Sequence, residues 1–132
     1  MTKYLIDTNI CIYFMKGLFD LKSKFEEADP DNCFISEITL AELKFGVENS
    51  VNKEKNQKVL DNFLSGVRVL PIFHCLDFYA KEKVRLRKAG TPIDDFDLLI
   101  GATAITHNLI MVTNNIKDFK KINGIQIEDW SK

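Results

Sequence analysis

The sequence predicts an α/β fold in which a short, mostly parallel sheet of about five strands is covered by helices. Helical and strand-like patterns alternate from one end of the chain to the other, which favours a parallel sheet with helical crossovers. No repeat, low-complexity tract or Gly/Ser-rich linker divides the 132 residues. Because this length is also near the commonest size of one domain, we expect a single domain over residues 1–132.

The predicted strands are short apolar runs rich in β-branched or aromatic residues. They cover residues 3–7, 33–36, 67–72, 109–113 and 125–127. Helices fill most of the gaps between them. Thr8 and Asn9 can cap the first helix, which runs to about Lys16, and Ser36 can cap a later helix that continues through Val47.

The remaining helices follow from apolar periodicity and from turn residues. An amphipathic segment carries Leu18, Leu21 and Phe25, and Pro30 ends it. Residues 59–64 hold apolar side chains on one helical face, and residues 76–88 form a strongly charged helix. After the break at residues 90–92, a new helix begins at residues 94–95 and ends near residue 108.

Composition and charge set broad limits on function. There is no apolar stretch long enough for a signal peptide or for the ~20 residues of a membrane span, so we expect a cytoplasmic protein. The scattered Cys11, Cys33 and Cys75 are typical of reduced core thiols. A net charge of −1 neither favours nor excludes nucleic acid as a partner. Basic residues nevertheless cluster, either as solvated helix faces or as phosphate sites, at Lys53, Lys55 and Lys58, at Lys81, Lys83, Arg85, Arg87 and Lys88, and at Lys117, Lys120 and Lys121.

Three acidic residues stand among apolar neighbours that belong in a core. Asp7 ends the first strand, Glu42 interrupts an apolar helix, and Asp97 opens another. A buried carboxylate is costly unless it is protonated, paired or bound to a metal. Since ligands bind at the carboxyl ends of parallel strands, Asp7 and Asp97 are expected to meet there, with Glu42 and the polar residues after the fourth strand, Thr113, Asn114 and Asn115.

Each acid also has a purely structural interpretation. Asp7 can cap the helix that follows, Asp97 can complement a helix dipole, and Glu42 can pair with Lys44 or another base. Taken together, the three acids favour a shared cation. Oxygen ligands suit Mg²⁺, with Mn²⁺ able to substitute, whereas a zinc site needs histidine or cysteine at ligand spacing, which His74 and His107 lack.

These residues resemble PIN-domain ribonucleases, specifically the VapC toxins of bacterial VapBC toxin–antitoxin systems. The resemblance spans essentially the whole chain, and the order and spacing of its motifs make it specific. The matching motifs are Leu5-Ile6-Asp7-Thr8-Asn9-Ile10-Cys11, Ile38-Thr39-Leu40-Ala41-Glu42-Leu43-Lys44-Phe45-Gly46, Gly90-Thr91-Pro92, Phe96-Asp97-Leu98-Leu99-Ile100, Val112-Thr113-Asn114-Asn115 and Glu128-Asp129-Trp130.

The resemblance implies a PIN-like three-layer α/β/α sandwich and an acidic catalytic triad of Asp7, Glu42 and Asp97. Asp7 and Asp97 would touch Mg²⁺ directly, and Glu42 would act through water. Many relatives carry a fourth acid where this chain has Asn115, which offers an oxygen but no charge. Thr8, Asn9, Thr113 and Asn114 would support the site or contact substrate. Asp94 and Asp95 depart from the family pattern, either as helix caps or as additions to the metal site.

The resemblance also implies a function and partners. The chain would hydrolyse RNA phosphodiesters, with transfer RNA cleaved in its anticodon loop as the leading substrate, and would inhibit translation until a VapB-type antitoxin neutralised it. A homodimer within a larger toxin–antitoxin assembly is expected. The antitoxin tail would lie in an apolar groove formed by Tyr13, Phe14, Leu18, Phe19 and the face around Phe63-Leu64, unless these residues are ordinary core.

Two other functions fit parts of the pattern. A PIN-like scaffold that binds RNA or protein without cutting is compatible with Asn115. A phosphatase of the HAD class also begins with a strand that ends in aspartate, but it needs a second aspartate two residues later, where this chain has Asn9. No glycine-rich phosphate loop follows any strand, which disfavours a nucleotide-binding module.

Overall fold

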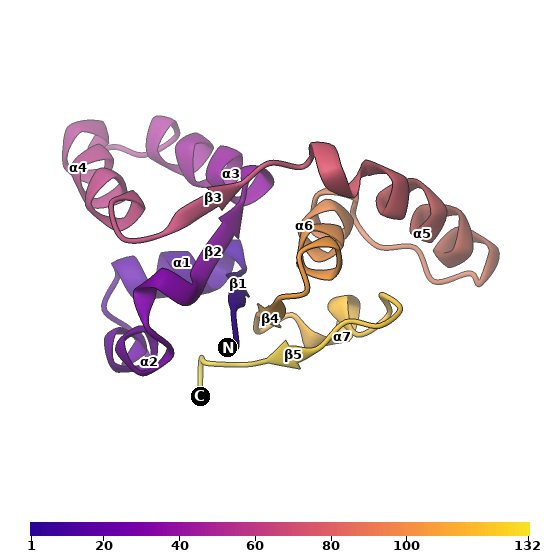
Figure 1. Cartoon of the computed structure of the whole chain (residues 1–132). Helices are drawn as coiled ribbons and strands as arrows, with labels where there is room; N and C mark the ends of the chain where they lie inside the picture. The colour runs from indigo at the N-terminus through magenta and orange to yellow at the C-terminus, as the bar shows by residue number, and fades with distance from the viewer.

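A five-stranded sheet with every neighbouring pair parallel forms the centre of the computed structural model, which describes residues 1–132 (Figure 1). The strand order is β3-β2-β1-β4-β5. The strands are β1 (Tyr4–Ile6), β2 (Cys33–Ser36), β3 (Arg68–Leu70), β4 (Ile110–Val112) and β5 (Ile127–Glu128). Leu5 of the central strand pairs with Phe34 on one side and with Met111 on the other. The first strand of the sequence therefore lies in the middle of the sheet, where it is covered on both faces.

Helices cover both faces of the sheet and complete three layers (Figure 1). One face is covered by α1 (Thr8–Met15), α2 (Leu21–Ala28), α3 (Glu37–Glu48) and α4 (Lys53–Leu64). The other is covered by α5 (Leu76–Lys88), α6 (Asp95–Thr106) and the short α7 (Ile116–Phe119). Two 3₁₀ helices, η1 (Pro30–Asn32) and η2 (Phe73–Cys75), lie in the connections. The α/β/α sandwich expected from the sequence is confirmed.

Two apolar cores follow from the alternation of side chains along the strands. Ile6 and Val112 point into the core beneath α1–α4, whereas Leu5 and Met111 point into the core beneath α5–α7. All four side chains are fully buried. Since both faces of the sheet are covered, its strands appear in the sequence as continuous apolar runs instead of alternating ones.

The predicted elements are present, but several boundaries differ. The third strand spans only Arg68–Leu70 and the fifth is shifted to Ile127–Glu128. The second helix begins at Leu21, so Leu18 lies outside it, because Phe19 and Asp20 both adopt positive φ angles of 57° and 52°. The prediction that Thr8 and Asn9 cap α1 was wrong. Asp7 is the capping residue, and Thr8 begins the helix.

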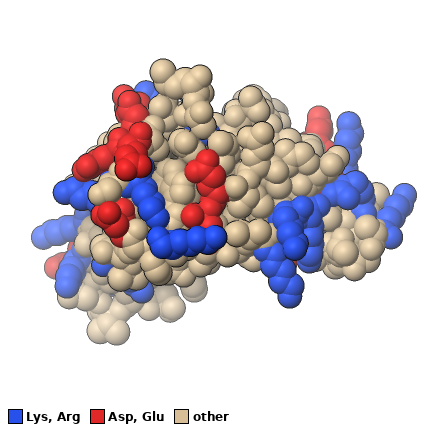
Figure 2. Space-filling model, turned by 90° about the horizontal axis from the view of Figure 1, so that it is seen from below, with Lys and Arg blue, Asp and Glu red and all other residues tan.

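The three cysteines are free thiols in the core, as predicted. No helix is at once long enough and apolar enough to span a membrane. Charge is unevenly distributed over the surface. Figure 2 shows Lys and Arg side chains gathered on the right of one face, the side on which α5 and α7 lie in Figure 1, while basic and acidic side chains are mixed on the left.

Candidate active site

Asp7 is fixed at the carboxyl edge of the sheet by both neighbouring elements. One carboxylate oxygen accepts a hydrogen bond of 2.8 Å from the backbone N–H of Thr8, and the other accepts one of 2.7 Å from the Thr113 hydroxyl. Its own N–H donates to the Val112 carbonyl of β4 at 2.9 Å. Asp7 is only 4% exposed, and burial raises the pKa of its carboxyl, against the two hydrogen bonds that lower it.

Glu42 is brought to the same edge by α3. Its Oε1 accepts a hydrogen bond of 2.7 Å from the Thr8 hydroxyl, which also lies 3.1 Å from the hydroxyl of the buried Thr39. The four ion pairs of the chain do not include Glu42, so the alternative in which it pairs with Lys44 is wrong. Thr8 therefore links the two acids, because its N–H donates to Asp7 and its hydroxyl donates to Glu42.

Asp97 lies in the first turn of α6 and is partly buried. Its pKa is raised from 3.8 to about 6, first by burial and then by the negative charges of Asp7, Asp94, Glu42 and Asp118. The helix that carries Asp97, α6, packs directly against α3, which carries Glu42, and against β1, which Asp7 follows. The structure thus brings together the three acids that stood out in the sequence, and no basic side chain forms an ion pair with any of them.

Asp94 and Asp95 have separate roles. Asp94 caps α6, since its Oδ2 accepts a hydrogen bond of 3.1 Å from the Phe96 N–H. Asp95 forms an ion pair of 2.9 Å with Lys83 and accepts a hydrogen bond of 3.0 Å from the Tyr79 hydroxyl, and these contacts lower its pKa. Capping is confirmed for Asp94, whereas Asp95 neither caps the helix nor joins the acidic cluster.

The segment after β4 supplies one residue that the sequence analysis missed. Asn115, the expected fourth position, donates a hydrogen bond of 3.3 Å from Nδ2 to Asp118 on α7, and its N–H donates to the Thr113 hydroxyl at 2.9 Å. Asp118 carries the fourth negative charge that acts on Asp97. The signal available in the sequence was an acid three residues beyond Asn115, one turn into a short helix.

Asn9 and Asn114, the other polar residues expected to support the site, are both exposed. Asn114 is exposed and donates a hydrogen bond of 3.1 Å to the Tyr13 hydroxyl of α1, which joins α1 to the loop after β4. Asn9 is exposed on α1. His74 is also exposed and stacks edge-on against the Phe73 ring. It therefore does not add a histidine ligand to the acids.

The donor set of this site fits a hard divalent cation. Four side chains, Asp7, Glu42, Asp97 and Asp118, offer carboxylate oxygens. Burial and the neighbouring negative charges raise the pKa of Asp7 and of Asp97, so the charged forms of these two carboxyls are unfavourable without a cation. No three His, Cys, Asp or Glu side chains approach closely enough to enclose an ion by themselves. Any cation bound here would therefore keep waters among its ligands.

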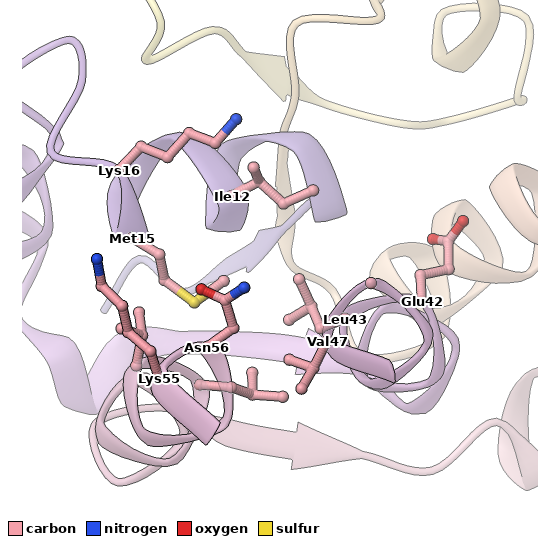
Figure 3. A pocket seen from close by; sticks show the side chains of 11 residues that line it. Ile12, Met15, Lys16, Glu42, Leu43, Val47, Lys55 and Asn56 are labelled. Carbon is pink, nitrogen blue, oxygen red and sulfur yellow. The ribbon is translucent and has the colours of Figure 1, made fainter. Parts of the chain in front are cut away.

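An apolar cavity of about 370 Å³ lies beside Glu42, between α1, α3 and α4 (Figure 3). Met15, Leu43 and Val47 form part of its apolar wall, and Glu42 lies at its edge on α3. The residues expected to form a groove are placed differently. Phe14 and Phe63 pack with Phe25 as core aromatics and line a separate cavity of about 220 Å³. Leu18 and Phe19 are instead exposed.

Comparison with known proteins agrees with this fold. Residues 4–125 match the PIN domain family model. The chain is 40% identical over 132 residues to Ribonuclease VapC2 of Rickettsia felis, covering 98% of both chains, and 36% identical to the tRNA(fMet)-specific endonuclease VapC of Salmonella typhimurium, covering 98% and 99%. The crystal structure of VapBC2 from R. felis bound to a promoter DNA fragment contains a chain that superposes with a TM-score of 0.91 at 39% identity, covering 98% and 99%.

These matches extend over nearly the full length of both proteins. The chain belongs to the PIN-domain family and, within it, to the VapC ribonuclease toxins of VapBC toxin–antitoxin systems.

Proposed function

We propose that the chain, as a single domain over residues 1–132, is a Mg²⁺-dependent endoribonuclease that hydrolyses RNA phosphodiester bonds, with Mn²⁺ able to replace Mg²⁺. The observation that carries this proposal is the cluster of carboxylates from four elements, Asp7, Glu42, Asp97 and Asp118. Of these, Asp118 alone forms an ion pair, with Lys121. Carboxylates gathered in this way lower the stability of the folded chain, and binding of a cationic ligand is the function that would account for them.

In this proposal Asp7 and Asp97 hold the cation directly, and Glu42 acts through a water. When bound, Mg²⁺ activates a water as the nucleophile and neutralises charge on the phosphate. Thr113 keeps the Asp7 carboxylate pointed into the site through its 2.7 Å hydrogen bond. Thr8 engages Oε1 of Glu42 and leaves Oε2 available to a water. Asp118, held by Asn115, supplies the further negative charge.

We propose transfer RNA, cut in its anticodon loop, as the substrate. The support is twofold: two relatives of 36% and 35% identity are named tRNA(fMet)-specific endonucleases, and a single-stranded loop can bend its backbone toward a recessed acidic site. Cleavage of this kind would inhibit translation, which is the toxic effect expected of the protein.

A VapB-type antitoxin is the proposed partner, and the 370 Å³ cavity between α1, α3 and α4 is the proposed seat of its tail. The cavity is largely apolar and ends at Glu42, so an apolar segment lying in it could carry an arginine or lysine to the acids. Such a cation would relieve the same repulsion that Mg²⁺ relieves, and inhibition would compete with the metal.

A homodimer is also proposed, within a larger toxin–antitoxin assembly. The support is a group of large apolar side chains that are exposed in the single chain. They lie on η2 and at the starts of α5 and α6. Phe73 is 72% exposed, Phe96 49% and Leu76 42%. Apolar side chains exposed together typically mark a protein interface.

The test is incubation of a total transfer-RNA pool with purified protein, in Mg²⁺ or in EDTA, beside Asp7→Asn protein prepared identically. We expect discrete fragments that require both the metal and Asp7, and mapping of their ends identifies the cleaved position. Fragments that persist in EDTA or with Asp7→Asn would overturn the assignment. Mg²⁺ binding without cleavage of any RNA would favour the scaffold that binds without cutting.

A further inference from the structure

We infer that the exposed cations of α5 and α7 form a phosphate-binding track that holds the RNA backbone beyond the scissile bond. We define this basic track by its members: Lys81, Arg85 and Lys88 on α5, and Lys117, Lys120 and Lys121 on α7 and the turn after it. The inference rests on the proposed function, because it assigns the surface that would hold the substrate of that site.

The two halves of the track are in direct contact. Residues 81, 85 and 88 share one face of α5 because they are four and three positions apart. The Arg85 guanidinium donates a hydrogen bond of 2.8 Å to the Lys121 carbonyl, and the N–H of Asn123 donates to Glu82 of α5. These bonds fix the helix against the turn after α7, and Figure 2 shows the resulting concentration of basic side chains.

The track begins at the acidic site. Lys121 forms an ion pair of 3.4 Å with Asp118 on α7, and α7 packs against α6, the helix that carries Asp97. The path from the reacting phosphate to α5 thus passes from Asp118 to Lys121 and on to Arg85. A substrate phosphate at the carboxylates would therefore lie beside the α7 end of the track, which carries Lys117, Lys120 and Lys121.

Most of the positive charge on the track is not neutralised by the protein itself. Arg85 is paired with the buried Glu82, and Lys121 with Asp118. The other four members are exposed and form no ion pair. They are Lys81, Lys88, Lys117 and Lys120.

A polyanion is the ligand that this surface fits. The chain carries a net charge of −1, and its site repels phosphate, so attraction for RNA must come from cations gathered elsewhere. Exposed cations act over roughly 8 Å at physiological salt, so only those adjoining the site can help to hold its substrate. Lysines on a flexible stem contact phosphates without regard to base, which implies affinity and not sequence selectivity.

The experiment measures binding in EDTA with Asp97→Asn protein, so that no RNA is cut. One variant combines Lys81→Gln, Lys88→Gln, Lys117→Gln and Lys120→Gln. The matched control removes the same charge from exposed lysines that form no ion pair and lie outside α3, α5, α6 and α7, through Lys3→Gln, Lys22→Gln, Lys58→Gln and Lys132→Gln. The probes are a total transfer-RNA pool and a duplex DNA of similar length, and the dissociation constant is followed as a function of salt concentration.

We expect the track variant to bind RNA at least about tenfold more weakly at 0.1 M salt, with the slope of log affinity against log salt reduced by roughly 3. The control should change affinity by about twofold or less. Equal weakening of both variants, no weakening of either, no RNA binding at all, or a loss confined to the DNA duplex would each overturn the inference. RNA binding through the track by an unmutated protein that cuts no RNA would refute only the proposed function.

Discussion

Replacing Asp97 by asparagine should stabilise the metal-free protein while it abolishes the proposed activity. The pKa of Asp97 is raised from 3.8 to about 6, so ionisation of this carboxyl opposes folding at neutral pH. At about 1.4 kcal/mol for each pH unit, the rise corresponds to at most about 3 kcal/mol. Since Asp97 is only partly buried, water screens its charge, and we expect a gain of about 1–2 kcal/mol from Asp97→Asn.

The sign of the pH dependence follows from the direction of the shift. Between pH ~4 and pH ~6 the folded protein holds a proton on Asp97 that the unfolded chain has lost, so its stability falls as the pH rises through this window. The advantage of Asp97→Asn should therefore be absent at pH 4 and complete above about pH 7. Urea denaturation of both proteins in EDTA, at these two pH values, measures it.

Asp95→Asn is the matched control, because Asp95 lies two residues away in the same turn but has a lowered pKa through Lys83. This variant should be no more stable than the wild type at any pH. If Asp97→Asn gives no gain at pH 7, or the same gain at pH 4, the charge repulsion that we infer among the site carboxylates is refuted.

Two further predictions concern side chains around the site and in the core. Thr113→Val removes the 2.7 Å hydrogen bond to Asp7, so cleavage should fall about 10–100-fold and the acid limb of the pH–rate profile should move to higher pH, while Thr113→Ser retains most of the activity. Thr113→Val with an unchanged pH profile would contradict this role. Gly101→Ala places a methyl group 2.3 Å from the buried Ile122 side chain and should cost about 1–3 kcal/mol in unfolding free energy, whereas Gly46→Ala, on an open part of α3, should stabilise by about 0.5–1 kcal/mol. Equal effects of the two glycine substitutions in thermal unfolding would show that α6 is not packed as described.

Much of the architecture could be predicted because each element has a local cause. The buried strands are apolar without interruption, and Ser36 and Asp94 cap their helices as the sequence indicated. The start of α2 could not be predicted, since Phe19 and Asp20 adopt left-handed backbone conformations that glycine or asparagine would ordinarily signal.

The site was partly predictable for a similar reason. Asp7, Glu42 and Asp97 stand out because a carboxylate among apolar neighbours is costly. Asp118 lies in a polar segment where an acid is unremarkable, and only the packing of α7 beside α6 gives it a neighbour in Asp97. Asp7 shows that two interpretations can hold together, because it caps α1 with one oxygen and faces the cluster as well.

The positions of the two cavities required the tertiary structure. Apolar helix faces look alike in sequence whether another helix covers them or not. Phe14 and Phe63 pack with Phe25 of α2 and line the 220 Å³ cavity, whereas Met15 and Val47 line the 370 Å³ cavity that ends at Glu42. Nothing in the pattern of α1 or α3 distinguishes these two environments.

The central claim is that the carboxylates at the carboxyl edge of the sheet hold a divalent cation. It is tested most directly by isothermal titration of Mg²⁺ into the purified protein without RNA, beside Asp7→Asn and Asp95→Asn. We predict saturable binding by the wild type, its loss in Asp7→Asn and its retention in Asp95→Asn. Absence of binding to the wild type, or equal binding by all three proteins, would contradict the account.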